Sequence, residues 1–252
     1  MHPELIRIGP LTIYTYGVFV AAGFLLGLGL AVRQAKKEGL PYEHIADLGF
    51  YILVGAIAGS RLFYVLLNIR HYLQNPLDAL KIWEGGLVFY GGLAAALVLA
   101  AWHLRRTGLP FWRTGDIFAP SLAIGHAIGR LGCFSAGCCH GAPADVPWAV
   151  TFTDPKSLAL KDIPLHPVQL YESGGEFAIF LLLIFLRKRR SFPGELLLAY
   201  GITYPVLRFI VEFFRGDEAR GFIAPWLSVS QAVSAVVFIV SLSVFLRLRK
   251  QA

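Results

Sequence analysis

Three arginines lie inside apolar stretches of this sequence that are long enough to cross a bilayer. Arg130 occurs in the segment DIFAPSLAIGHAIGRLGCF, and Arg61 and Arg208 have similar surroundings. A charged side chain at the centre of a bilayer costs about 2.5–3.5 kcal/mol on insertion scales, and a guanidinium does not escape this cost by losing its proton. Three such cations predict a site for an anionic head group. The alternative is that each arginine pairs with a carboxylate or with helix carbonyls.

The composition places these arginines in a helical membrane protein. The chain is 56% hydrophobic and 15% charged, with a mean hydropathy of +0.60, whereas soluble domains carry about 25% charged residues. Apolar runs of about twenty residues match a hydrocarbon thickness of ~30 Å, and helices satisfy their own backbone groups in lipid. We therefore predict an all-α polytopic membrane protein. It should form a single integral-membrane domain over residues 1–252, with small outer-face segments near 69–86 and 135–166.

The sequence predicts about seven transmembrane helices and their orientation. The predicted spans are 11–32, 46–68, 87–104, 115–134, 167–186, 194–214 and 228–246. The connections alternate in charge, because one set carries 13 Lys and Arg residues and the other set carries 7. The positive-inside rule then places the N-terminus outside and the C-terminus in the cytoplasm, and it explains the net charge of +7 without a nucleic-acid partner. Arg61, Arg130 and Arg208 each fall late in an outward-going span, so they should lie toward the outer leaflet and could share one pocket.

Motifs along nearly the whole chain resemble the prolipoprotein diacylglyceryl transferase family. They are IRIGPLTIYTYG near the start, GSRLFYV around Arg61, FYGGL at 89–93, GRLGCF at 129–134, HPVQLYE at 166–172 and RFIVEFFR at 208–215. The resemblance implies transfer of the diacylglyceryl group of phosphatidylglycerol to the lipobox cysteine thiol of a prolipoprotein, with glycerol phosphate leaving. It also implies a multi-pass protein of the bacterial plasma membrane whose active site faces outward. We expect no cofactor and no bound metal.

The resemblance also assigns site residues. Arg130 and Arg208 match the family's lipid-binding and catalytic arginines, and this fits the chemistry, because an arginine fork is well suited to phosphate oxygens. Preorganised cations also stabilise charge that develops on a leaving group in a water-poor site. Glu212 lies four residues after Arg208 on the same helix face, where it either orients or merely neutralises that arginine. The other candidate substrate-binding residues are Gly132, Arg61 and Tyr16, and for Tyr16 an interfacial aromatic belt is the alternative.

The sequence departs from the usual family pattern at the position of the general base. Tyr90 replaces the histidine that the family carries before GGL, and an unperturbed tyrosine, with a pKa of about 10, is a poor base at neutral pH. Three routes stay open. In the first, nearby arginines ionise Tyr90. In the second, His126, one helical turn before Arg130, accepts the proton; the alternative for this residue is a hydrogen-bonded structural histidine. In the third, no strong base is needed, because a thiol with a pKa of about 8.5 is already partly ionised.

A second departure is a group of cysteines where the family usually has asparagine and glutamate. The residues concerned are Cys133, Ala136 and Cys138, followed by Cys139 and His140. We expect free thiols. An oxidising exterior also permits a disulfide, and a Cys₃His zinc site is the third interpretation, although consecutive ligands do not easily close one tetrahedron.

Two functions from other classes compete with the transferase. A small-anion transporter would also use arginines within the membrane, but transporters commonly show paired repeats or broken helices, and the sequence shows neither. A thiol or redox membrane protein would use Cys138 and Cys139.

Overall fold

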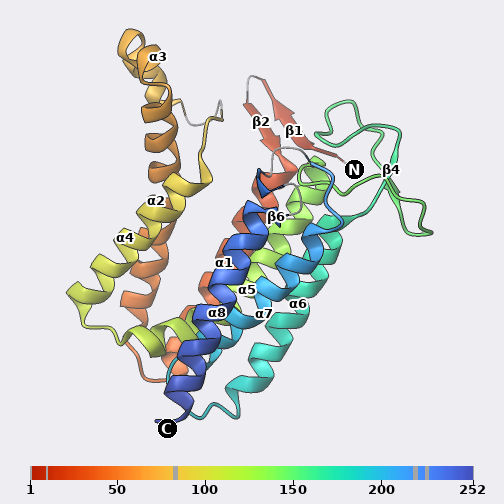
Figure 1. Cartoon of the computed structure of the whole chain (residues 1–252). Coiled ribbons are helices and arrows are strands. Elements are labelled where there is room, and N and C mark those ends of the chain that lie inside the picture. Colours follow the sequence, from red (N-terminus) through yellow and green to blue (C-terminus); the bar gives the residue numbers. More distant parts are fainter. Residues whose placement is uncertain (1, 10, 82–84, 218–220, 225–226, 252) are drawn as a thin grey trace. The chain divides into compact units, whose positions relative to one another are not determined.

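The structure is a computed structural model that describes residues 2–9, 11–81, 85–217, 221–224 and 227–251. Helices dominate the described residues (Figure 1). The long helices are α1 (Thr15–Lys37), α2 (Tyr42–Leu67), α4 (Phe89–Thr107), α5 (Phe111–Ala136), α6 (Val168–Arg187), α7 (Glu195–Glu212) and α8 (Val229–Arg249). Two short helices follow α2, namely α3 (Ile69–Gln74) and the 3₁₀ helix η1 (Pro76–Leu80).

Each of the seven long helices overlaps one of the seven predicted ranges, with boundaries that differ by up to five residues, and the prediction of a helical, multi-pass membrane protein is confirmed. Five of them, α1, α2, α5, α6 and α8, are long and apolar enough to cross a membrane by length and composition. The remaining two long helices are not in this group; α4 ends in Arg105 and Arg106, and α7 contains Glu195, Arg208 and Glu212. The number of spans and their orientation stay predictions.

Short β-hairpins were not predicted, and one of them corrects a helix boundary. Residues 11–14 were assigned to the first span, but β2 (Leu11–Tyr14) pairs antiparallel with β1 (Glu4–Ile8), and α1 begins only at Thr15. The left-handed backbone at Gly9, with φ of 59°, lies in the turn between the strands. The other hairpins join β3 (Val150–Thr151) to β4 (Pro164–Leu165) and β5 (Phe222–Ala224) to β6 (Leu227–Ser228).

The chain divides into two compact units. The large unit comprises residues 1–30 and 115–252, and the small unit comprises residues 31–114. In the small unit α2 packs along α4 through small residues, because Gly59 of α2 lies against Gly91 and Ala95 of α4. Small residues let helix backbones approach closely where lipid supplies no hydrophobic driving force.

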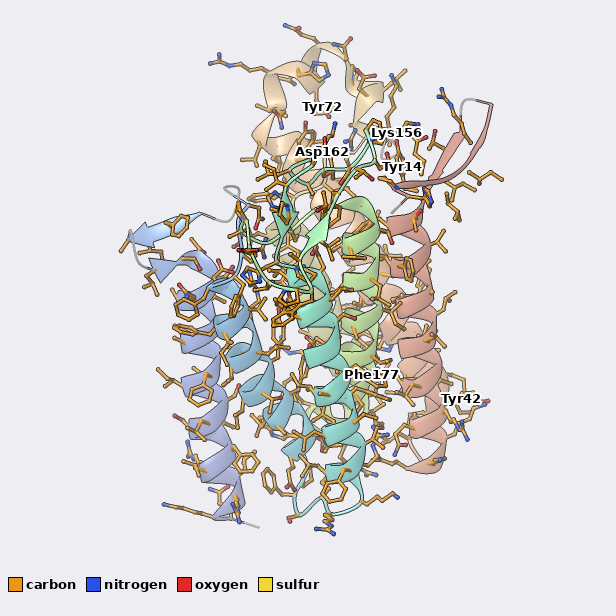
Figure 2. All side chains as sticks on the ribbon, turned by 90° about the vertical axis from the view of Figure 1, so that its right-hand side faces the viewer. Tyr14, Tyr42, Tyr72, Lys156, Asp162 and Phe177 are labelled. Atoms are coloured by element: carbon orange, nitrogen blue, oxygen red, sulfur yellow. The ribbon has the colours of Figure 1, made fainter. Side chains whose placement is uncertain are left out.

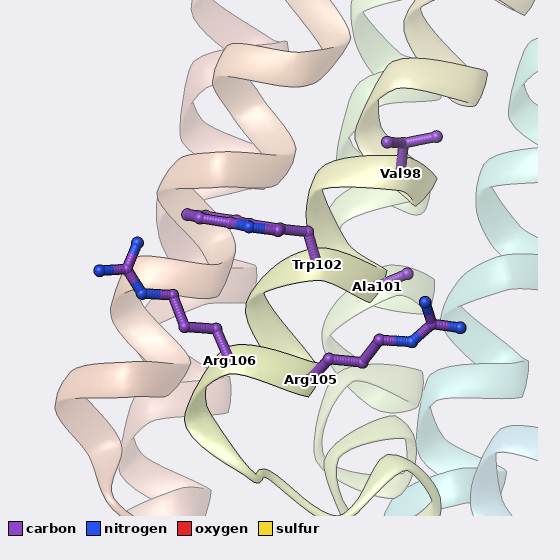
Figure 3. A pocket seen from close by; sticks show the side chains of 5 residues that line it. All are labelled: Val98, Ala101, Trp102, Arg105 and Arg106. Carbon is purple, nitrogen blue, oxygen red and sulfur yellow. The ribbon is translucent and has the colours of Figure 1, made fainter.

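The C-terminal end of α4 carries a shallow apolar pocket with a basic margin. Figure 3 shows its lining residues, and its volume is about 570 Å³. The Arg106 guanidinium lies 5.2 Å from the ring of Trp102. The pocket contains none of the predicted site residues. Its lining residues are Val98, Ala101, Trp102, Arg105 and Arg106.

The two ends of the large unit differ in structure. Its hairpins gather at one end, while the α6–α7 connection and the C-terminus lie at the other (Figure 1). Tyr14, Lys156 and Asp162 lie at the hairpin end (Figure 2), where Lys156 pairs with Glu4 of β1. The C-terminal ends of α5 and α7 point toward this end. The last turns of α5 and α7 therefore position the candidate site residues next to the hairpins.

Asp116 of α5 is fully buried and caps the N-terminus of α7. Its carboxylate accepts hydrogen bonds from the backbone N–H groups of Gly194, Leu196 and Leu197 at 2.7, 2.8 and 3.0 Å. Arg190 adds an ion pair at 3.3 Å. The first N–H groups of a helix lack partners within the helix, and a carboxylate also complements the positive end of the helix dipole. This contact therefore attaches the start of α7 to α5.

We expect Asp116→Ala to destabilise the protein strongly. The substitution removes the buried carboxylate that accepts from three backbone N–H groups and pairs with Arg190, and breaking a buried ion pair in this way costs roughly 3–5 kcal/mol. For a chain of this size, the midpoint of thermal unfolding in detergent should fall by about 10 °C. Asp47→Ala, which removes an exposed carboxylate of α2, is the matched control and should leave the midpoint nearly unchanged. Equal midpoints for both variants would show that the cap contributes nothing.

Candidate functional site

Two acidic residues of α6 and two basic residues of α5 form one buried network in the large unit. Glu172 and Glu176 are 1% and 0% exposed. Arg130 Nη2 lies 2.7 Å from Glu172 Oε1, and His126 Nδ1 lies 2.6 Å from Glu176 Oε1. On α6, Glu172 and Glu176 are four positions apart, as are His126 and Arg130 on α5. This spacing places the two residues of each helix on one helix face. The two helices thus meet through matching pairs of opposite charges.

The hydrogen bonds of this network assign the proton on His126. Arg130 Nε donates to His126 Nε2 over 3.2 Å, and since a guanidinium has no acceptor, Nε2 must supply a lone pair. The ring proton therefore lies on Nδ1 and points to Glu176, which also accepts a hydrogen bond of 3.3 Å from the Tyr200 hydroxyl. His126 holds the Arg130 guanidinium, and its basic lone pair is engaged in doing so.

Arg208 is fixed in a similar way by α7 and α8. Its Nη1 lies 2.6 Å from Glu212 Oε2, on the helix face that the spacing of four residues predicted. Its Nη2 donates to Ser230 Oγ of α8 over 3.0 Å. Tyr204 lies one turn before Arg208 on α7, and its ring centroid lies 5.2 Å from that of His126 on α5.

The end of α5 lies against the beginning of α1. A Cβ atom on Gly132 would lie 3.0 Å from Phe19 Cβ and 3.1 Å from the Tyr16 carbonyl oxygen. A side chain at this position would therefore push the two helices slightly apart. Tyr16 itself is 43% exposed, and its hydroxyl interacts electrostatically with Arg130 and with the three cysteines.

The three cysteines lie together just beyond Arg130. No disulfide joins them in the structure, and their sulfur atoms lie within 4.8 Å of one another. Arg130 Nη1 is 4.0 Å from Cys133 Sγ. Hydrogen bonds from the thiols of Cys133 and Cys138, together with nearby arginines, lower the pKa of the Cys139 thiol. His140 directs Nδ1 to the Gly141 carbonyl at 3.0 Å.

Arg61 lies in the small unit, where backbone carbonyls surround its guanidinium. Its Nε donates to Ala79 at 2.9 Å, and its Nη2 donates to Asp78 at 2.6 Å. Its Nη1 donates to Gly85 at 2.7 Å, and the rings of Tyr64 and Tyr72 lie 5.7 and 5.6 Å away. The carbonyl pairing that the sequence left open as an alternative therefore describes this arginine.

Tyr90 also belongs to the small unit and stands in the first turn of α4. It is 62% exposed, and its ring contacts that of Phe89 with the centroids 5.6 Å apart. The hydroxyl is thus available to a partner from outside this helix.

Sequence reasoning missed Glu172, Glu176 and Tyr204 as members of the site. A signal for the two glutamates was present, because YESGGEFAIFLLL carries two carboxylates four residues apart at the start of an apolar helix. This spacing repeats that of His126 and Arg130. Ionisable residues inside membrane helices are expected to pair with one another. The spacing of the two glutamates could therefore have been matched to that of His126 and Arg130.

The network is suited to holding a phosphate group. The Arg130 side chain stays 14% exposed although Glu172 is almost completely covered. Among the described residues, its Nη1 contacts only the Cys133 sulfur, at 4.0 Å, so donor capacity remains on the side facing the cysteines. A guanidinium that neighbouring residues hold rigidly offers two parallel N–H groups to phosphate oxygens.

Comparisons with known proteins identify relatives along the whole chain. The family model described as prolipoprotein diacylglyceryl transferase matches residues 3–247. The "Phosphatidylglycerol--prolipoprotein diacylglyceryl transferase" of Geobacillus kaustophilus is 37% identical over 245 residues, covering 96% of this chain and 90% of that protein. The protein of the same name from Clostridium tetani is 34% identical over 253 residues and 100% of both chains. That from Finegoldia magna is 37% identical over 237 residues, covering 94% and 91%. The chain therefore belongs to the prolipoprotein diacylglyceryl transferase family.

Proposed function

We propose that the protein transfers the diacylglyceryl group of phosphatidylglycerol to the lipobox cysteine thiol of prolipoproteins, at the outer face of the bacterial plasma membrane. The names of its relatives state both substrates, and the family match extends over nearly the whole chain. The structural observation that carries the proposal is the Arg130 guanidinium, which His126 and Glu172 hold while part of it stays accessible.

The reaction exchanges one bond at a glycerol carbon. The sulfur of the lipobox cysteine forms a C–S bond, and the C–O bond to the phosphate breaks. Glycerol phosphate leaves with the electron pair of that bond, and the thiol proton passes to a base or to solvent. Negative charge grows on the phosphate oxygens as the bond breaks, so fixed cations beside them lower the barrier.

We assign Arg130 and Arg208 to the phosphate as catalytic residues. His126 positions Arg130, and Glu212 positions Arg208, through the contacts described above. Tyr90 supplies a hydroxyl that helps to hold the thiol or the head group. Tyr16 and Gly132 belong to the substrate-binding region, and Arg61 contributes by fixing the carbonyls of Asp78, Ala79 and Gly85.

Removing the Arg130 guanidinium should abolish transfer. A lipobox peptide incubated with phosphatidylglycerol and purified protein should gain the mass of a diacylglyceryl group with the wild type and gain nothing with Arg130→Ala. Arg130→Lys should rescue poorly, because a point charge lacks the bidentate geometry. Arg7→Ala, which changes an exposed arginine of β1, is the control and should be fully active. A folded, fully active Arg130→Ala protein would contradict the phosphate-binding role, and an inactive wild type would contradict the proposed function.

The roles of His126 and Tyr90 can be separated in the same assay. We expect His126→Ala to lower kcat, and His126→Gln to recover much of it, because an amide oxygen accepts from Arg130 Nε but takes up no proton at neutral pH. If His126→Gln is as inactive as His126→Ala, the histidine acts as a base. A loss of ~10²–10⁴-fold in Tyr90→Phe alone would instead assign the acid–base role to Tyr90.

The outward-facing site requires a definite topology. Reporter domains fused after the α6–α7 connection, which carries Arg187 to Arg190, and after the C-terminus should both be cytoplasmic, because these segments are rich in cations. A reporter inserted in the 143–163 segment should be outside. Opposite locations for these reporters would place the site at the inner face and overturn this part of the proposal.

A further inference from the structure

The backbone that follows α5 reverses direction and returns two cysteines to a third. After the helix ends at Ala136, Gly137 adopts φ of 79°, and its N–H donates to the Cys133 carbonyl over 2.9 Å. Cys139 then adopts φ of 56°, a left-handed conformation that non-glycine residues seldom take. These two left-handed residues bring the side chains of Cys138 and Cys139 to that of Cys133.

Other parts of the large unit hold this loop in place without using the thiols. Gln169 Nε2 donates to the Cys138 carbonyl over 2.8 Å. The N–H of Leu158 donates to the Ala136 carbonyl over 3.0 Å, and the N–H of Gly216 donates to the His140 carbonyl over 3.1 Å. The loop that brings the sulfur atoms together is therefore held by hydrogen bonds in which the thiols take no part.

The three sulfur atoms lie close enough together to form a thiolate metal site. All three lie within 4.8 Å of one another, and sulfur ligands of a tetrahedral zinc ion, with Zn–S distances of about 2.3 Å, lie about 3.8 Å apart. Three thiolates around Zn²⁺ carry one net negative charge, and a cation lies beside them, because Arg130 Nη1 is 4.0 Å from Cys133 Sγ.

We propose that Cys133, Cys138 and Cys139 bind a thiophilic metal ion, Zn²⁺, and that its fourth coordination position receives the thiol of the acceptor cysteine. Three protein ligands with one open position are typical of catalytic zinc. Cys138 and Cys139 are only half-buried, so a fourth ligand can approach. His140 does not belong to this group, whose ligand atoms come from the three cysteines.

The second half of this proposal rests on the proposed function, and it explains how a site with Tyr90 in place of histidine generates its nucleophile. A thiol bound to zinc loses its proton, which passes to solvent. An electron pair of the thiolate sulfur forms the C–S bond and the C–O bond to the phosphate breaks. Glycerol phosphate leaves with the electron pair of that C–O bond. Arg130 lies beside the cysteines, so the nucleophile and the leaving phosphate would be neighbours. The thioether product is a neutral, weak ligand, and water replaces it on the ion.

Metal content tests the site without reference to activity. The full-length protein, purified in detergent under reducing conditions, should contain roughly one zinc per chain, or take up one Zn²⁺ or Co²⁺ after dialysis. Single Cys→Ser variants at the three positions should bind little metal. His44→Gln is the matched control, since His44, Asp47 and His103 form the other group of suitable ligands among the described residues, and it should retain the metal. Failure to bind Zn²⁺ or Co²⁺, loss of the metal in the His44 variant alone, or a disulfide found by mass spectrometry in the reduced, unalkylated protein would overturn the site.

The fourth ligand is tested with the Co²⁺-loaded protein. Adding a lipobox peptide in the absence of phosphatidylglycerol should strengthen the sulfur-to-cobalt charge-transfer absorption, whereas the same peptide with serine in place of cysteine should not. An unchanged spectrum with the cysteine peptide, at concentrations where the wild type transfers, would overturn the coordination of the acceptor. Absence of transfer together with a cysteine-specific spectral change would contradict the proposed function while leaving the metal site and its ligand in place.

Discussion

The need to neutralise charge inside an apolar bundle determines how the helices of the large unit pair. Glu172 and Glu176 are buried where no water compensates an unpaired carboxylate, so α6 must present them to cations on a neighbouring helix. Arg130 and His126 of α5 meet this requirement. The apolar core beside them contains small side chains such as Ala119 and Ala123, and small side chains constrain helix rotation only weakly. The ionic pairs therefore determine which face of α5 is turned toward α6.

Local patterns could be read from the sequence, whereas contacts between helices could not. The long helices follow from apolar runs, and the pairing of Arg208 with Glu212 follows from a spacing of four residues within one helix. The partners of Arg130 lie on α6, 42 positions away, and a single sequence does not tell which helices are neighbours. Arg61 illustrates the same limit: an apolar stretch around an arginine has the same appearance whether the guanidinium meets a ligand or the carbonyls of its own chain.

The cysteines show that backbone conformation can overrule an argument from spacing. Adjacent cysteines in an extended chain point in opposite directions, which is why consecutive ligands looked unsuited to one ion. The left-handed conformation of Cys139 changes this geometry, and a non-glycine residue gives little sign in the sequence that it will adopt positive φ. Gly137 is different, because a glycine just beyond a helix is a known signal for a left-handed end. The expectation of free thiols stays a prediction. The argument that consecutive cysteines do not reach one metal ion, however, no longer applies to this loop.

The cap that Asp116 provides has a consequence at the opposite end of the bundle. Arg130 lies fourteen residues beyond Asp116 in α5, and Arg208 lies fourteen residues beyond Gly194, whose N–H that carboxylate binds. Both helices leave the cap in the same direction, and at a rise of 1.5 Å per residue each arginine is about 21 Å from it. The distance along the helix from the cap is thus the same for Arg130 in α5 and for Arg208 in α7. Arg130 and Arg208 consequently lie at about the same depth on two separate helices, which is a condition for both to bind one phosphate.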